Sequence, residues 1–249
     1  MNVRLGCRRS ALRRIARCAF AVLIAAAGGC SAIPIDPHSF PLERLSEAHR
    51  AKVEAVLSDV AAVVSLEGGR VKSRPEIYDF LLDEMPFTGG VVRALGRGDW
   101  KIFRDPERPE RNVFHVLDAD GMSLRFELVW REPSRRLYVS EGVFPMGILP
   151  ALRGSTVVVM RTIPQGEEVW TDAVVYVRVE TPFYSGLAKG LRGLVEDKVR
   201  EKSGYFIRAA RWVAEEAAAR PDELCRAAAG SPEVDPAALE EFRKRFAGP

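Results

Sequence analysis

The sequence predicts an α+β fold in which N-terminal helices precede an antiparallel β-meander of about six strands, and a long C-terminal helix packs on the sheet. Three observations support this prediction. Apolar residues recur at helical spacing before residue 96, at a spacing of two between Asp99 and Glu180, and again at helical spacing from Thr181 to about Ala219. Because the period-two segments are separated by short loops, successive strands are expected to pair as antiparallel neighbours.

Composition and charge exclude several classes of protein. With 47% hydrophobic and 29% charged residues, the 249-residue chain can build a core, which excludes a disordered chain or a collagen-like fibre. The 37 Lys and Arg residues outnumber the 34 Asp and Glu residues, but six arginines lie within the first 17 positions, where no acid occurs. The chain after residue 29 therefore carries about −3, which disfavours a nucleic-acid-binding protein.

The first 29 residues predict a signal peptide. A basic stretch ends at Arg17, and the uncharged run Cys18–Gly29 is too short to span a bilayer as a helix. This run ends in Ala27-Gly28-Gly29-Cys30, which resembles the lipobox of bacterial lipoproteins, although that family more often has Leu where Ala27 stands. The resemblance implies that Cys30 is lipidated and becomes the new N-terminus.

A lipidated Cys30 would anchor the protein permanently in a membrane, since each buried methylene of an acyl chain contributes about 0.8 kcal/mol. Ser31 follows the cysteine where the family's inner-membrane retention signal places Asp, so the resemblance implies the outer membrane, facing the periplasm. The alternative is that Cys30 is an ordinary cysteine of a cleavable secretory signal. Cys7 and Cys18 leave with the signal in either case, and Cys225 alone predicts no disulfide framework.

Domain organisation follows from composition along the chain. Residues 30–41 contain three prolines and little periodicity, which is typical of a tether. Residues 42–220 are expected to form the main domain. Residues 221–249 are expected to form an appendage with one short helix, which begins after Asp235-Pro236.

The helices before the sheet are expected at three places. Helical spacing predicts an amphipathic helix from Leu42 to about Leu66, in which His49 lies on the apolar side as a boundary or hydrogen-bonded core histidine. A second helix is expected over residues 74–84, and Pro86 separates it from a third, which Thr88 begins and which ends near Leu95.

The strands are expected at residues 112–117, 123–130, 135–144, 155–162 and 167–180, with a further short segment at residues 100–102. Turn residues such as Asp120-Gly121 and Gln165-Gly166 separate them. Strict alternation places one set of large apolar residues on a single face of the second of these strands. This set is Leu124, Phe126, Leu128 and Trp130.

The expected order is helices, then a meander, then one long helix that begins at Thr181-Pro182. This order resembles the helix-grip fold of the START and Bet v 1-like (SRPBCC) families over about residues 70–219. The resemblance rests on element order and not on a sequence motif. It implies a cavity between a curved sheet and the long helix, and many members of these families bind sterols, phospholipids or other apolar ligands.

The lead hypothesis is a membrane-anchored envelope lipoprotein that binds a hydrophobic ligand, a lipid first of all, in such a cavity and without catalysis. The residues expected to contact this ligand come from the strands and the start of the long helix. They are Trp100, Phe126, Leu128, Trp130, Glu141, Val175, Val177, Phe183, Leu187 and Leu191.

Two alternatives remain open at this point. The first is a structural or assembly lipoprotein that acts through protein contacts. The second is a cyclase-like enzyme in which Glu141 and His115 point inward as acid and base. In the competing interpretation of the strand at residues 112–117, Phe114 and Val116 face inward instead of His115. Because no metal-ligand spacing, phosphate loop or nucleophile motif occurs, the sequence predicts no cofactor and no metal.

Overall fold

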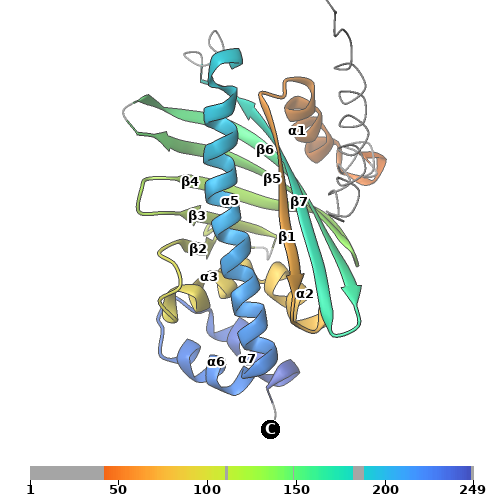
Figure 1. Ribbon diagram of the computed structural model, residues 1–249, viewed down its shortest axis with the longest axis vertical. Helices are drawn as coiled ribbons and strands as arrows, with labels where there is room; N and C mark the ends of the chain where they lie inside the picture. The colour runs from red at the N-terminus through yellow and green to blue at the C-terminus, as the bar shows by residue number, and fades with distance from the viewer. Residues whose placement is uncertain (1–41, 110–111, 148, 182–187, 248–249) are drawn as a thin grey trace, which may run out of the picture. The chain divides into compact units, whose positions relative to one another are not determined.

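The computed structural model describes residues 42–109, 112–147, 149–181 and 188–247. Within these ranges it confirms the α+β fold, with seven strands instead of about six. The strands form one antiparallel sheet in the order β1-β7-β6-β5-β4-β3-β2 (Figure 1). The predicted signal peptide, Cys30, the tether, Phe183 and Leu187 lie outside the described residues.

Six of the strands pair with their neighbours in the chain, as the short loops predict. β1 is the exception, since it pairs with β7 and forms the other edge of the sheet. The strands are β1 (Ala62–Val71), β2 (Lys101–Arg104), β3 (Val113–Leu117), β4 (Ser123–Glu132), β5 (Arg135–Met146), β6 (Leu149–Gln165) and β7 (Glu168–Val179).

The helices cover both faces of this sheet. The long helix α5 crosses one face, which we call the inner face, and α1 packs against β6 and β7 on the opposite, outer face (Figure 1). After a short 3-10 turn at Leu42–Arg44, the helices are α1 (Glu47–Ser58), α2 (Pro75–Asp83), α3 (Met85–Ala94), α5 (Ala188–Ala219), α6 (Pro221–Ala229) and α7 (Pro236–Phe246).

The predicted helix from Leu42 to Leu66 is wrong in its second half. The helix ends at Ser58, and Ala62–Val71 is a strand. Buried and exposed side chains alternate from Ala62 to Glu67, which is the period of a strand with one face on the core. A short run of valines satisfies helical and strand spacing equally, so periodicity alone does not separate the two.

The main core lies between the inner face, α5 and the shorter helices. Phe80 of α2 and Phe87 of α3 pack against Phe242 of α7, with ring centroids 5.5–5.7 Å apart. Residues 221–249, which the sequence separates as an appendage, thus supply two helices to the same core. Their apolar faces need this partner, because neither helix could bury it alone.

A second, smaller cluster lies under α1 on the outer face. Val53 and Val56 of α1 pack on Leu137, Val159 and Tyr176 of the sheet, and all five are buried. The centre of the sheet is therefore covered on both faces. This arrangement explains why β5 and β7 have apolar residues at consecutive positions as well as at alternate ones.

Candidate functional site

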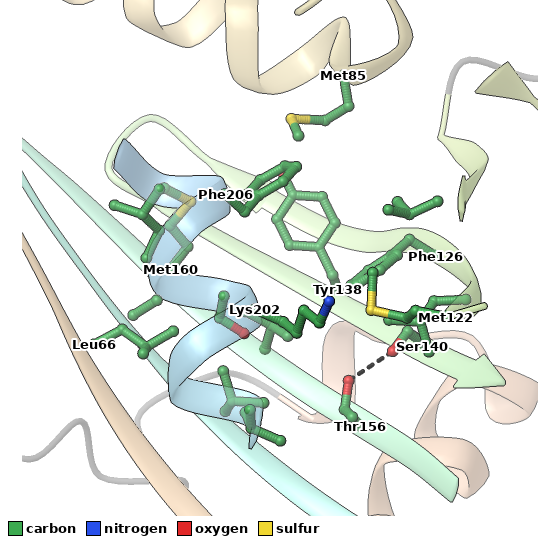
Figure 2. A pocket seen from close by; sticks show the side chains of 18 of the residues that line it. Leu66, Met85, Met122, Phe126, Tyr138, Ser140, Thr156, Met160, Lys202 and Phe206 are labelled. Carbon is green, nitrogen blue, oxygen red and sulfur yellow. Dashed lines mark hydrogen bonds between the residues drawn. The ribbon is translucent and has the colours of Figure 1, made fainter. Parts of the chain in front are cut away.

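A cavity of about 130 Å³ lies between the inner face of the sheet and α5 (Figure 2). Apolar side chains from the edge strand β1 and from β3 to β7 line it, together with Trp100 just before β2, the end of α2, the start of α3 and the middle of α5. Among them are Leu66, Trp100, Phe114, Phe126, Val158, Val175 and Phe206.

Three methionines belong to this lining. Met85 begins α3, Met122 lies beside the β3–β4 turn, and Met160 lies on β6, so their side chains approach the cavity from three sides (Figure 2). Methionine is unbranched and has a polarisable sulfur, so it adapts to irregular shapes. A lining of this kind can change shape around a bound group without movement of the backbone.

The sheet contributes a pair of hydroxyl groups to the cavity. Ser140 of β5 and Thr156 of β6 lie directly opposite each other in the antiparallel register. Their oxygens form a hydrogen bond of 2.7 Å, and the two residues are 4% and 5% exposed. The lining is therefore mostly apolar, and this hydroxyl pair is a buried polar position on its sheet side (Figure 2). Tyr138 on the sheet and Lys202 and Ser203 on α5 also bring polar groups to the lining.

Lys202 of α5 lines the cavity with its side chain and holds the β3–β4 turn with its ammonium group. Its Nζ donates to Asp118 Oδ2 at 2.7 Å and to Asp120 Oδ2 at 2.6 Å. The Asp118 side chain is buried and also accepts the Met122 N–H at 2.8 Å. Burial alone would lower the pKa of Lys202, but the two carboxylates outweigh burial and raise it above its ordinary value.

Three of the residues predicted to bind the ligand, Trp100, Phe126 and Val175, line the cavity. Val177 is buried in the same core, outside the lining, and Leu128 borders a separate hollow beside α2 and α7. Leu191 lies in α5.

Trp130 was expected on the inner face and lies on the outer face. The β4–β5 register shifts between Leu128 and Trp130, and this bulge breaks the alternation that holds from Leu124 to Leu128. Trp130 consequently packs against the cluster under α1. One inserted residue is enough to move every later side chain of a strand to the other face.

Glu141 and His115 also lie on the outer face, so the cyclase-like arrangement is wrong. Arg125 donates to Asp105 at 2.7 Å and lies 3.6 Å from Glu141, while His115 Nε2 lies 3.3 Å from Asp105. The hydrogen bond from Arg125 lowers the pKa of Asp105 to about 2. Phe114, next to His115, faces the cavity, as the competing interpretation of this strand proposed.

Sequence reasoning missed the groups that give the cavity its character. Leu66 was assigned to a helix, and Lys202 was one of several charges on α5. The sequence predicts no orientation for Ser140, because the orientation of its strand stays open until the sheet is assembled. The consecutive apolar residues Leu137, Tyr138 and Val139 are the signal that could have indicated that both faces of β5 are covered.

The comparisons with known proteins give distant structural likenesses. No protein-family model matches the chain, and no curated protein matches it. The structure of TTHA0849 from Thermus thermophilus is 18% identical, with 62% of this chain and 98% of that chain covered and a TM-score of 0.41. The di-domain ARO/CYC protein BexL of the BE-7585A biosynthetic pathway is 14% identical, with 68% and 55% covered and a TM-score of 0.43.

A third structure, an uncharacterized protein from Rhizobium leguminosarum, is 16% identical, with 59% of this chain and 92% of that chain covered and a TM-score of 0.27. Within the described residues, no group of three or more His, Cys, Asp or Glu side chains could hold a metal ion. None of the helices in that part of the chain is both long and apolar enough to cross a membrane.

Proposed function

We propose that this protein is a membrane-anchored envelope lipoprotein that binds a hydrophobic ligand between the sheet and α5. The observation that supports binding is the apolar cavity itself, because well-packed cores contain few voids larger than a water molecule. A domain of this size that leaves about 130 Å³ unfilled forgoes packing contacts along the whole lining. A ligand would restore those contacts.

The size of the cavity limits what it can enclose. An apolar cavity of about 150 Å³ accommodates a benzene molecule, and the volume here is similar, about 130 Å³. The enclosed part of the ligand is therefore about one ring or a short length of acyl chain. A membrane lipid would insert only such a part, with adjustment of Met85, Met122 and Met160.

In this proposal, lipidation of Cys30 places the cavity close to a membrane. A lipidated cysteine followed by the segment at residues 31–41 would hold the domain beside a membrane, where apolar molecules are concentrated. The signal-peptide pattern and the Ala27-Gly28-Gly29-Cys30 motif support this part of the proposal.

The test is native mass spectrometry of the chain from Ser31 onward, expressed without its anchor in a lipid-containing host, followed by organic extraction. We expect a stoichiometric apolar ligand on the wild-type protein. Val158→Phe should remove it, because Val158 lines the cavity and a larger side chain fills the space. Val63→Phe is the control, since Val63 is 39% exposed on β1.

Extraction would separate a membrane lipid from a smaller molecule and so name the ligand class. The binding proposal is wrong if two results are obtained together. The folded wild-type chain carries no ligand, and any apolar compound added to it binds the Val158→Phe variant equally well. The structural or assembly lipoprotein would then be the better hypothesis, and the search would turn to protein partners.

A further inference from the structure

The hydroxyl pair on the sheet has hydrogen-bonding capacity that the protein does not use. Each hydroxyl offers one donor and two acceptor positions, and the bond between Ser140 and Thr156 uses one donor and one acceptor. Among the described residues no second hydrogen bond reaches either oxygen. One O–H and three lone pairs thus remain at an almost fully buried position that lines the cavity.

Unused capacity of this kind is unfavourable in an apolar site, because a buried polar group away from water costs free energy until it finds a partner. A ligand hydroxyl could donate to the pair and accept from it, and a ligand carbonyl could accept. A pure hydrocarbon would leave the capacity unused. The pair therefore favours a ligand that carries one polar atom on its enclosed part.

The charges at the cavity disfavour an anion. Lys202 is the one charged side chain among the described residues of the lining, and two carboxylates already hold its ammonium group. Asp118 and Asp120 outnumber that single positive charge. An anionic group would meet no free cation there and would lose its hydration without compensation.

Resting on the proposed function, we propose that the ligand is an uncharged molecule whose enclosed part is about one ring and carries a hydroxyl or carbonyl hydrogen-bonded to Ser140 and Thr156. The volume fixes the size, the hydroxyl pair fixes the polar atom, and the neutralised Lys202 fixes the absence of charge. None of these three constraints depends on the others.

The test uses the full chain in phospholipid nanodiscs, with the methionine methyl groups labelled for NMR. Met122 and Met160 line the cavity, whereas Met146 is buried outside the lining and serves as the internal control. Three ligands of similar size are titrated: 4-methylphenol, which has a hydroxyl, toluene, which lacks it, and benzoate, which is an anion. Each ligand is compared between wild-type and variant chains, so that its partition into the lipid cancels.

We expect 4-methylphenol and toluene to shift the Met122 and Met160 methyl signals saturably, and benzoate to shift neither. In the Ser140→Ala/Thr156→Val double variant, the Kd of 4-methylphenol should rise about 2- to 12-fold, as expected for the loss of one net hydrogen bond. The Kd of toluene should not rise, which also shows that the cavity is intact. Ser155→Ala, on the neighbouring outward position of β6, should leave both values unchanged.

The outcomes separate this inference from the proposed function. If toluene and 4-methylphenol bind but the double variant changes neither, or if benzoate shifts the Met122 and Met160 methyl signals saturably, the inference is wrong and the hydrophobic cavity remains a binding site. If none of the three ligands shifts the lining methyl groups, the proposed function itself fails.

Discussion

Arg136 of β5 brings a full positive charge into the core with 1% of its side chain exposed. Its guanidinium donates to Asp79 at 2.9 Å and to Asp83 at 3.1 Å, both on α2. Burial raises the pKa of Asp83, although Arg136 and Arg131 oppose this. These ion pairs attach α2 to the sheet, since a buried guanidinium needs its carboxylate partners and the carboxylates need the guanidinium.

Replacing Arg136 should therefore be costly. We expect Arg136→Met to lower the free energy of unfolding by about 3 kcal/mol, because it leaves two partly buried carboxylates without their shared partner. The control is Arg131→Met: Arg131 also contacts Asp83, at 2.7 Å, but is 50% exposed, so its loss should cost less than about 1 kcal/mol. Urea denaturation, monitored by circular dichroism, measures the free energy of unfolding of both variants. Equal losses would contradict the claim that the buried Arg136 stabilises the fold more than the exposed Arg131.

At the scale of elements, α1 is held on the outer face by its valines and by one buried carboxylate. Glu127 of β4 has 2% of its side chain exposed and accepts hydrogen bonds from His49 at 3.0 Å and Lys52 at 3.2 Å. Burial pushes the pKa of Glu127 upward, but these two partners outweigh it and the pKa lies below its ordinary value. His49 is therefore a hydrogen-bonded boundary histidine, as the sequence predicted.

The docking of α1 should weaken in acid. A carboxyl whose pKa is lower in the folded than in the unfolded state contributes stability above the unfolded value, about 4.3 for Glu, and loses it as the pH falls through the folded value. The stability difference between wild type and Glu127→Gln should thus be fully present at pH 6 and shrink below about pH 4. Hydrogen exchange of the amides of α1 across this range measures it.

Glu54→Gln on the exposed side of α1 is the matched control and should change exchange little at any pH. A difference between wild type and Glu127→Gln that stays constant from pH 6 to pH 3 would show that the charge of Glu127 does not hold α1.

The described part of the molecule has three layers, with α1 on the outer face, the sheet, and α5 with the shorter helices on the inner face (Figure 1). The inner layer is incompletely filled, and the Lys202–Asp118 pair joins α5 to the β3–β4 turn beside the empty volume. In the proposed function this domain follows a lipidated cysteine and a short tether, so the whole chain would act beside a membrane.

This anchoring predicts a simple outcome for Cys30→Ser. Cells supplied with labelled palmitate should label the wild-type chain, and the label should fall to background in Cys30→Ser, with the protein moving to the soluble fraction. The acyl chains contribute about 0.8 kcal/mol per buried methylene, so their loss leaves little to hold the chain. Cys225→Ser should keep label and location, because Cys225 is buried in α6. Membrane-bound, labelled Cys30→Ser protein would contradict the lipoprotein assignment.

Much of the fold was readable from the sequence because it depends on local patterns. Alternation gave the strands from β3 to β7 and the inward face of Leu124 and Phe126, short turns gave their antiparallel order, and helical spacing gave α5. Trp100, Phe126 and Val175 could be placed in the cavity for the same reason: each belongs to an apolar set that must be buried.

Only the tertiary structure decided which face each remaining side chain takes and which distant groups meet. Both faces of β5 are covered, so its sequence fits either orientation until α1 is in place over Leu137 and Val139, which leaves Ser140 facing the cavity. The bulge that turns Trp130 outward depends on the pairing of β4 with β5. Lys202 and Asp118 are 84 residues apart in the sequence, and a contact over such a separation cannot be predicted from sequence periodicity. Local periodicity is a property of one segment, whereas the cavity is made by segments packed against one another.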